Sequence, residues 1–83
     1  MEKYVMTPKE KNLAEIGEIA YKYGYTAEDV LGKSRYRRLV MVRRECVGML
    51  RAKGYSTTEI GRILNRDHST IVVSLQILAA NNG

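Results

Sequence analysis

The sequence predicts an all-α protein, a small helical bundle that contains a helix-turn-helix. Apolar residues recur at helical spacing through most of the chain, and no segment of useful length alternates as a strand would. The one proline, Pro8, stands at the start of a helical pattern, and glycines and capping residues separate the other helical patterns. With 83 residues the chain has room for one domain, expected over residues 7–80 with flexible ends at residues 1–6 and 81–83.

The first helix is expected to begin at a capping box, in which a threonine and an acidic residue three positions later bond to each other's backbone N–H groups, and the second at a similar cap-like start. Residues 7–10 start a helix that ends at Gly24, and Pro8 takes the first helical position, where an N–H is not needed. Residues 26–29 start a short helix that ends at Gly32. One side of the first helix is apolar and is expected to face the core: Leu13, Ile16, Ala20 and Tyr23.

A longer helix is expected from a cap at Ser34 to about Ala52. Its apolar residues share one arc of the helical wheel, which predicts the side facing the core: Leu39, Val42, Cys46, Val47, Met49 and Leu50. Arg43 projects near the middle of that arc. It is therefore expected to pair with a carboxylate or with helix-end carbonyl groups, or to extend its head past the edge of the core. Three arginines at seven-residue spacing follow one flank, where they could track a phosphate backbone or simply face solvent: Arg37, Arg44 and Arg51.

The last two helices have the spacing of a helix-turn-helix. Residues 56–59 form another capping box, and Asp67 is a suitable N-cap for the final helix. The motif needs a small residue where its helices cross, which Gly61 supplies, and a turn residue that tolerates positive φ, which Asn65 supplies. Ile71 is the branched apolar residue that would pin the second helix. Two amphipathic helices of unrelated function could also fit this loose pattern.

The charge distribution favours a polyanion as partner. The chain has 14 basic and 9 acidic residues, and all its arginines lie between Arg35 and Arg66. Residues 1–32 hold four basic and six acidic residues, whereas residues 33–83 hold ten basic and three acidic ones. Clustered arginine in a chain of pI about 9.6 is typical of nucleic-acid binders, while a basic face can also serve solubility alone.

The same residues argue against catalysis, cofactors and membranes. Neither glycine-rich phosphate motif occurs, G-x-x-x-x-G-K-[ST] or G-x-G-x-x-G. A catalytic pair of Cys46 and His68 would need a third orienting group, and a lone histidine lacks metal-site spacing. We therefore expect no enzyme, cofactor or metal. Without a signal peptide, a membrane span or a second cysteine, the protein is expected in the cytoplasm, associated with the nucleoid.

Several segments resemble the C-terminal DNA-binding domain (domain IV) of the bacterial chromosomal replication initiator DnaA. Residues 66–71 (Arg-Asp-His-Ser-Thr-Ile) resemble the R-D-H-[ST]-T-V signature of that family, and residues 56–61 are similar to its S-L-x-E-I-G segment. Residues 32–35 resemble S-K-x-R, and residues 43–46 stand in the place of R-Q-x-A. The similarity covers about residues 12–78.

This resemblance implies a TrpR-like helical domain that binds double-stranded DNA at a DnaA-box-like site. The start of its last helix would enter the major groove, and Arg35 would enter the adjacent minor groove. The residues at base-contacting positions are Arg35, Thr57, Thr58, Asp67, His68 and Ser69. The residues expected at phosphates are Thr70, Arg37, Arg44, Arg51, Lys53, Arg62 and Arg66. The resemblance implies neither a nucleotide nor a membrane as partner.

The chain departs from the family pattern in three ways. Thr57 and Thr58 replace an apolar pair, so the preferred site is expected to differ. Val73 and Ile77 stand where the family usually has polar residues; we expect them to pack on the first helix or, as the alternative, to form a partner or dimer surface on an otherwise monomeric protein. The initiator's ATPase domain is missing from these 83 residues. We therefore expect a replication or transcription accessory that occupies initiator sites. The alternative is a protein-interaction module that targets the host initiation machinery.

Overall fold

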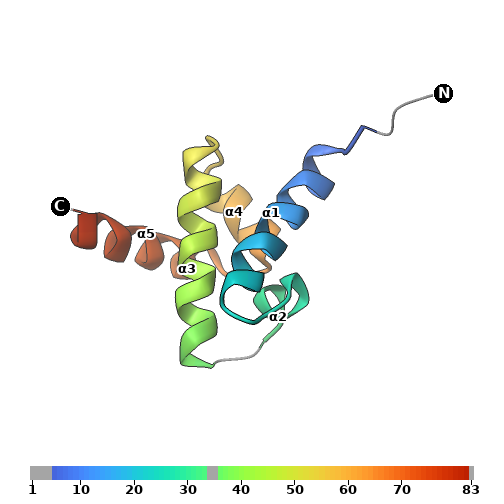
Figure 1. The fold of residues 1–83 in the computed structure, drawn as a ribbon. Helices are drawn as coiled ribbons and strands as arrows, with labels where there is room; N and C mark the ends of the chain where they lie inside the picture. Colours follow the sequence, from blue (N-terminus) through green and yellow to red (C-terminus); the bar gives the residue numbers. More distant parts are fainter. Residues whose placement is uncertain (1–4, 34–35, 83) are drawn as a thin grey trace.

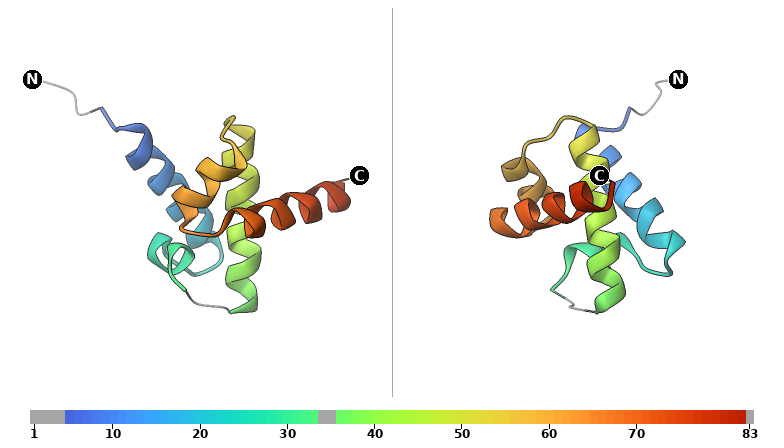
Figure 2. Two further views of the ribbon diagram at one scale, coloured as in Figure 1. Left: turned by 180° about the vertical axis from the view of Figure 1, so that it is seen from behind. Right: turned by 90° about the vertical axis from the view of Figure 1, so that its left-hand side faces the viewer.

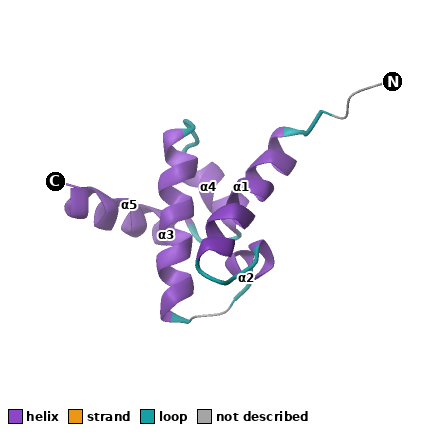
Figure 3. Cartoon of the chain, viewed as in Figure 1, coloured by secondary structure: helices purple, strands orange, loops and turns teal. Residues whose placement is uncertain are grey.

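The computed structural model describes residues 5–33 and 36–82, and within these ranges it consists of helices joined by short loops (Figures 1 and 3). The helices are α1 (Pro8–Lys22), α2 (Ala27–Leu31), α3 (Arg37–Ala52), α4 (Thr57–Leu64) and α5 (His68–Asn82). No strand occurs in the described ranges, so the predicted all-α fold class is confirmed. None of these five helices of the described chain is long and apolar enough to cross a lipid bilayer.

The long helix α3 is the centre of the bundle and packs against each of the other four helices. α1 and α5 leave α3 on opposite sides (Figures 1 and 2). Buried side chains from all five helices form one core around α3: Ile16, Ala20, Val30, Leu39, Val42, Cys46, Val47, Leu50, Ile60, Leu64 and Ile71. The core-facing arc predicted for α3 is confirmed, with Met49 half-buried against the same core. Each fully buried aliphatic side chain contributes about 1.5–3 kcal/mol to stability, so this core holds the five helices together.

Three of the helices begin at capping boxes, of which the sequence predicts those of α1 and α4 as such and that of α2 as a cap-like start. In α1 the Thr7 hydroxyl accepts from the Glu10 amide at 3.2 Å, and the Glu10 carboxylate accepts from the Thr7 amide at 3.1 Å. The same reciprocal bonds begin α2 at Thr26 and α4 at Ser56. These bonds satisfy amides that have no partner inside the helix, so the starts of α1, α2 and α4 are fixed locally.

The ends of two other helices differ from the sequence prediction. α3 begins at Arg37, and Tyr36 at its N-cap position makes no side-chain cap. The predicted cap, Ser34, lies outside the described residues. α5 continues to Asn82, past the expected domain end at residue 80. Lacking a side-chain cap, α3 depends on its tertiary packing for stability.

Two residues predicted for the core side of α1 are instead largely exposed, Leu13 at 44% and Tyr23 at 40%. Asn12 is buried in their place. Its side-chain amide donates to the Tyr55 hydroxyl at 2.8 Å, and its oxygen accepts from Lys53 at 2.8 Å. A buried amide is tolerated when it is hydrogen-bonded, and these partners come from the loop and cap that follow α3.

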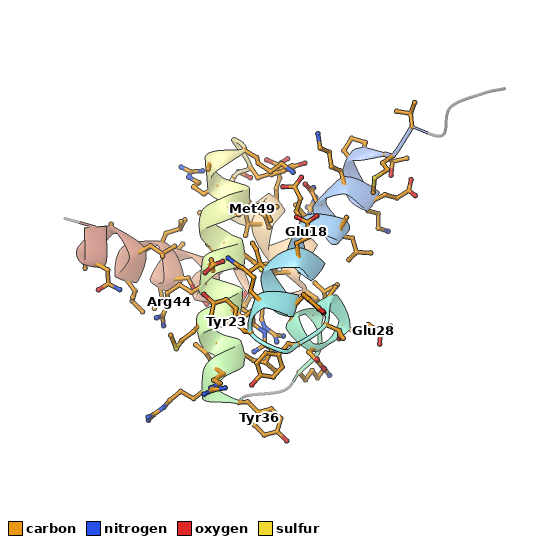
Figure 4. The ribbon with its side chains drawn as sticks, viewed as in Figure 1. Glu18, Tyr23, Glu28, Tyr36, Arg44 and Met49 are labelled. Atoms are coloured by element: carbon orange, nitrogen blue, oxygen red, sulfur yellow. The ribbon has the colours of Figure 1, made fainter. Side chains whose placement is uncertain are left out.

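Val73 and Ile77 of α5 lie beside α3 rather than α1, so their predicted packing on the first helix is wrong. They line a groove of about 300 Å³ together with Val40 and Arg44 of α3. Figure 4 shows Arg44 on the side of α3 that faces α5. Val73 remains 52% exposed. The groove therefore leaves part of the apolar surface of α5 open to solvent.

Candidate nucleic-acid interface

The turn between α4 and α5 has the geometry that a helix-turn-helix requires. Asn65 has φ 55° and ψ 47°, and it is the only non-glycine residue with positive φ in the described chain. A Cβ built on Gly61 would lie 2.8 Å from the Arg66 carbonyl oxygen. The Arg66 amide in turn donates to the Gly61 carbonyl at 2.8 Å. Ile71 is buried next to Gly61, so the three predictions for this motif are confirmed.

The helix α5 begins with an exposed polar turn. Asp67 holds the N-cap position, because its carbonyl accepts from the Thr70 amide at 3.1 Å and from the Ile71 amide at 3.3 Å. Its carboxylate accepts from the Ser69 hydroxyl at 2.8 Å. His68, Ser69 and Thr70 are exposed, as is Asp67 itself. The residues predicted to read bases from α5 thus share one accessible turn, where helix amides and the helix dipole attract anions.

A hydrogen bond joins the start of α5 to the start of α4. His68 Nε2 lies 2.8 Å from the Thr57 hydroxyl oxygen. Thr57 is half-buried, whereas Thr58, the next residue of α4, is exposed. The sequence did not indicate this bond, because its partners belong to different helices and stand eleven positions apart.

A hollow of about 450 Å³ lies beside this polar turn, between α4 and the start of α5. Its lining includes two guanidinium groups, a side-chain amide, a carboxylate, a hydroxyl and the imidazole. The lining residues are Thr58, Gly61, Arg62, Asn65, Arg66, Asp67 and His68. These groups can donate to and accept from a base edge, and the guanidinium groups can also bind a phosphate.

Two arginines hold the end of α2 in place, Arg43 from α3 and Arg66 from the turn between α4 and α5. Arg43 donates from Nε to the Val30 carbonyl at 2.8 Å. Its Nη2 donates to the carbonyls of Asp29 at 3.2 Å and Gly32 at 3.0 Å. Arg66, predicted as a phosphate contact, also donates to the Gly32 carbonyl. The predicted pairing of Arg43 with helix-end carbonyls is confirmed, and burial, followed by the nearby charge of Arg66, lowers the pKa of Arg43.

Three of the predicted phosphate-binding arginines have unused donors. Arg37 and Arg62 are exposed and make no hydrogen bond or salt bridge within the described chain. Arg44 is half-buried in the groove beside Thr70, and its Nε is buried without a partner among the described residues. Arg35, predicted for the minor groove, lies outside the residues that the structure describes.

Two other predicted phosphate contacts have partners inside the protein. Lys53 Nζ lies 2.8 Å from the Glu15 carboxylate and 2.8 Å from the Asn12 oxygen, so it ties the end of α3 to α1. Arg51 donates to the Tyr55 carbonyl at 3.0 Å at the end of α3. These partners inside the protein compete with a DNA phosphate for the same side-chain donors. The arginines predicted as one stripe along α3 therefore do not form a continuous free edge.

The thiol of Cys46 belongs to the core. It is buried, and burial raises its pKa to about 12, so the thiol is protonated at neutral pH and is a poor nucleophile. His68 stands on the exposed start of α5 and bonds to Thr57. Among the described residues, no group of three or more His, Cys, Asp or Glu side chains could hold a metal ion.

The tight turn, the exposed polar start of α5 and the arginines around it define a helix-turn-helix domain of the DNA-binding class. Comparison with known families identifies which one. Residues 14–77 match the family described as the bacterial DnaA protein helix-turn-helix, and the chain belongs to this family.

The chain is similar to several chromosomal replication initiator proteins. It is 34% identical over 64 residues to DnaA 1 of Chlamydia pneumoniae, a match that covers 76% of this chain and 14% of that protein. For DnaA 1 of Chlamydia trachomatis the identity is 36% over 61 residues, covering 72% and 13%. For DnaA 2 of Chlamydia caviae it is 34% over 62 residues, covering 74% and 14%. The chain thus spans a small part of the length of these relatives. No solved structure matches it.

Proposed function

We propose that this protein binds double-stranded DNA with sequence preference, at a site related to the DnaA box, by inserting the start of α5 into the major groove. The observation that carries this proposal is the exposed turn at residues 67–70. Gly61 and Asn65 hold that turn at a fixed angle, and unused guanidinium groups border it. Membership of the DnaA helix-turn-helix family supports DNA binding in general.

The polar turn supplies the contacts to bases. His68 and Ser69 meet base edges from α5, and Thr58 meets them from α4. Asp67 caps α5 and accepts from a cytosine amine, which accounts for an acidic residue at a DNA surface. Thr70 and the first amides of α5 donate to a phosphate, which fixes the position of the helix along the DNA.

The arginines around this turn supply the contacts to the DNA backbone. Arg37, Arg44 and Arg62 neutralise phosphates, because no hydrogen bond or salt bridge within the described chain engages their guanidinium groups. Arg35 enters the adjacent minor groove, where a narrow A·T-rich segment concentrates negative potential. Arg66 has a smaller role at phosphates, since it also holds Gly32. Arg51 and Lys53, at the end of α3, are not assigned to phosphates because they are bonded within the protein.

The biological role that fits is an accessory in replication or transcription that occupies or titrates initiator sites. Such a protein acts as a monomer in the cytoplasm, on the nucleoid, without nucleotide and without a catalytic step. The match to the DnaA helix-turn-helix family supports the DNA-recognition part of this role.

Fluorescence anisotropy with two labelled duplexes tests the proposed function. One duplex carries a DnaA-box-like word, and the other carries the same bases in scrambled order. We expect about tenfold or tighter binding to the first duplex at physiological salt. Equal affinity for both duplexes would contradict sequence preference, and no binding to either at low salt would contradict DNA binding.

Replacing His68 with alanine is expected to weaken binding to the preferred duplex by about 1–3 kcal/mol, because a base-edge contact is lost. Binding to the scrambled duplex should weaken much less. Gln76 is exposed further along α5 and has no proposed role, so Gln76→Ala is the matched control. Equal losses on both duplexes would mean that His68 contacts the backbone or supports the fold instead.

Replacing Arg62 with glutamine is expected to weaken binding on every sequence alike. Loss of one phosphate contact lowers the slope of log affinity against log salt by about 1. Lys11→Gln removes the same charge from the exposed side of α1 and should leave the slope unchanged. A salt titration of both variants checks this, and identical slopes for the two would remove Arg62 from the interface.

A second candidate function is favoured by one observation on α5. Residues 69–82 carry no Lys, Arg, Asp or Glu, and Val40, Val73 and Ile77 leave an apolar groove partly open. This groove suits protein interaction, including a dimer of this chain. Sedimentation with and without duplex distinguishes the two functions. A protein complex that survives high salt, with no duplex binding at low salt, would favour the second.

A further inference from the structure

We propose that Thr57 is a positioning residue, which fixes the imidazole of His68 and thereby sharpens base preference at the start of α5. This inference rests on the proposed function, DNA binding through α5. It starts from the 2.8 Å contact between the Thr57 hydroxyl and His68 Nε2, which bridges the first residues of two helices. Thr57 thus acts through His68 and not by touching a base itself.

Both partners of this bond stand on fixed parts of the backbone. Thr57 follows Ser56, whose hydroxyl accepts from the Glu59 amide at 3.2 Å in the capping box of α4. His68 follows Asp67, whose carbonyl accepts from the Thr70 and Ile71 amides. Threonine also has few side-chain rotamers in a helix, so the hydroxyl is held in one place. Groups on helix starts fixed in this way hold their geometry better than groups on loops.

The bond determines which ring nitrogen is available to DNA. Nε2 is engaged by Thr57, while Nδ1 of His68 has no hydrogen-bond partner in the described part of the chain. In a neutral imidazole one nitrogen donates and the other accepts, and the Thr57 hydroxyl can pair with Nε2 in either role, so the bond fixes the orientation of the ring. The ring cannot turn over without breaking this bond. A base edge therefore meets Nδ1 in one orientation.

A fixed ring discriminates better than a mobile one. An exposed histidine without a partner samples several rotamers, and ordering it on DNA would reduce affinity. It could also satisfy different bases by turning its ring. The apolar side chain that the family usually carries at this position has no hydroxyl for such a bond. The positioning is therefore a property of this chain's own residues.

The ring state is measured first, in the absence of DNA. His68 is the only histidine, so a ¹⁵N-detected spectrum of the imidazole reports it without ambiguity. The variants are Thr57→Val, which keeps the shape and removes the hydroxyl, and Thr57→Ser, which keeps the hydroxyl. We expect the valine variant to shift the Nε2 signal, because that nitrogen loses its hydrogen bond to the hydroxyl, and the serine variant to match wild type. Unchanged ring signals in the valine variant would overturn the proposal.

The effect on DNA recognition is measured next. The duplexes are the preferred one and three versions altered at the base pair where His68→Ala loses preference. We expect Thr57→Val to reduce discrimination among them about fivefold, with Thr57→Ser near wild type. In a His68→Ala background the valine substitution should have no further effect, because Thr57 acts through the ring.

Three results on DNA would overturn the inference. Thr57→Val could retain full discrimination, or it could weaken binding as much in the His68→Ala background as alone, which would make Thr57 a direct contact. In both cases wild type still prefers one duplex, so the proposed function stands. If wild type prefers no duplex, the proposed function fails, and the positioning role of Thr57 in base preference fails with it.

Discussion

Replacing Gly61 with alanine is expected to destabilise the fold by about 2 kcal/mol and to remove most of the sequence preference on DNA. The new Cβ would lie 2.8 Å from the Arg66 carbonyl oxygen. That oxygen belongs to the backbone of the turn, so relief of the clash requires α4 and α5 to move apart. The resulting strain exceeds the gain of about 1 kcal/mol that alanine brings to a helix interior.

Gly17 provides a matched control for this substitution. It lies inside α1, and a Cβ there would be 3.9 Å from the Ala27 Cβ, an ordinary contact. Gly17→Ala should therefore leave stability unchanged or raise it by up to about 1 kcal/mol. Urea unfolding followed by circular dichroism measures both variants. If Gly61→Ala proved as stable as Gly17→Ala, the close crossing of α4 and α5 would be refuted.

Replacing Arg43 with methionine is expected to destabilise the protein by about 3 kcal/mol. Methionine keeps much of the packing volume but donates no hydrogen bond. The carbonyls of Val30, Asp29 and Gly32 would lose charged donors at 2.8–3.2 Å, at a partly buried position. The end of α2 would then lose these bonds to α3 and keep the one from Arg66 to Gly32, three residues before Arg35 in the sequence.

Two further variants separate the hydrogen bonds of Arg43 from its charge. Arg43→Lys keeps the charge but cannot reproduce the fork of a guanidinium, so it should recover only part of the loss. Arg38 is exposed and makes no hydrogen bond or salt bridge with the described residues, and Arg38→Met should change stability by less than about 0.5 kcal/mol. Thermal unfolding checks all three. Equal melting temperatures for Arg43→Met and Arg38→Met would exclude the anchoring role.

The parts of the fold with local causes could be predicted from the sequence. Capping boxes join residues three positions apart, so the starts of α1, α2 and α4 follow from the residue types alone. The turn at Asn65 and the close approach at Gly61 follow from backbone freedom at single positions. Arg43 could be predicted to need a partner, because its place on the apolar arc leaves a charge to be satisfied.

The parts with long-range causes could not be predicted. Asn12 is buried because Tyr55 and Lys53, more than forty positions away, satisfy its amide. No spacing along α1 indicates those partners. The bond between Thr57 and His68 likewise depends on the angle at which α4 meets α5.

The sequence also could not predict which basic side chains of the candidate site are free to bind DNA. The residue types and the family resemblance give a set of basic residues that could reach phosphates. They do not show which of them are already bonded, as Lys53 is to Glu15 and Arg66 is to Gly32. Those partners come from distant parts of the chain. Only the packed structure separates free from bound guanidinium and ammonium groups.

Selection of duplexes from a random library, with wild type and His68→Ala in parallel, tests most directly whether the first turn of α5 reads DNA bases. We predict that wild type enriches one word related to the DnaA box. The variant should lose selectivity at one or two adjacent base pairs and keep the remainder of the word. Identical words for both proteins, or no enrichment by wild type, would contradict recognition through this turn.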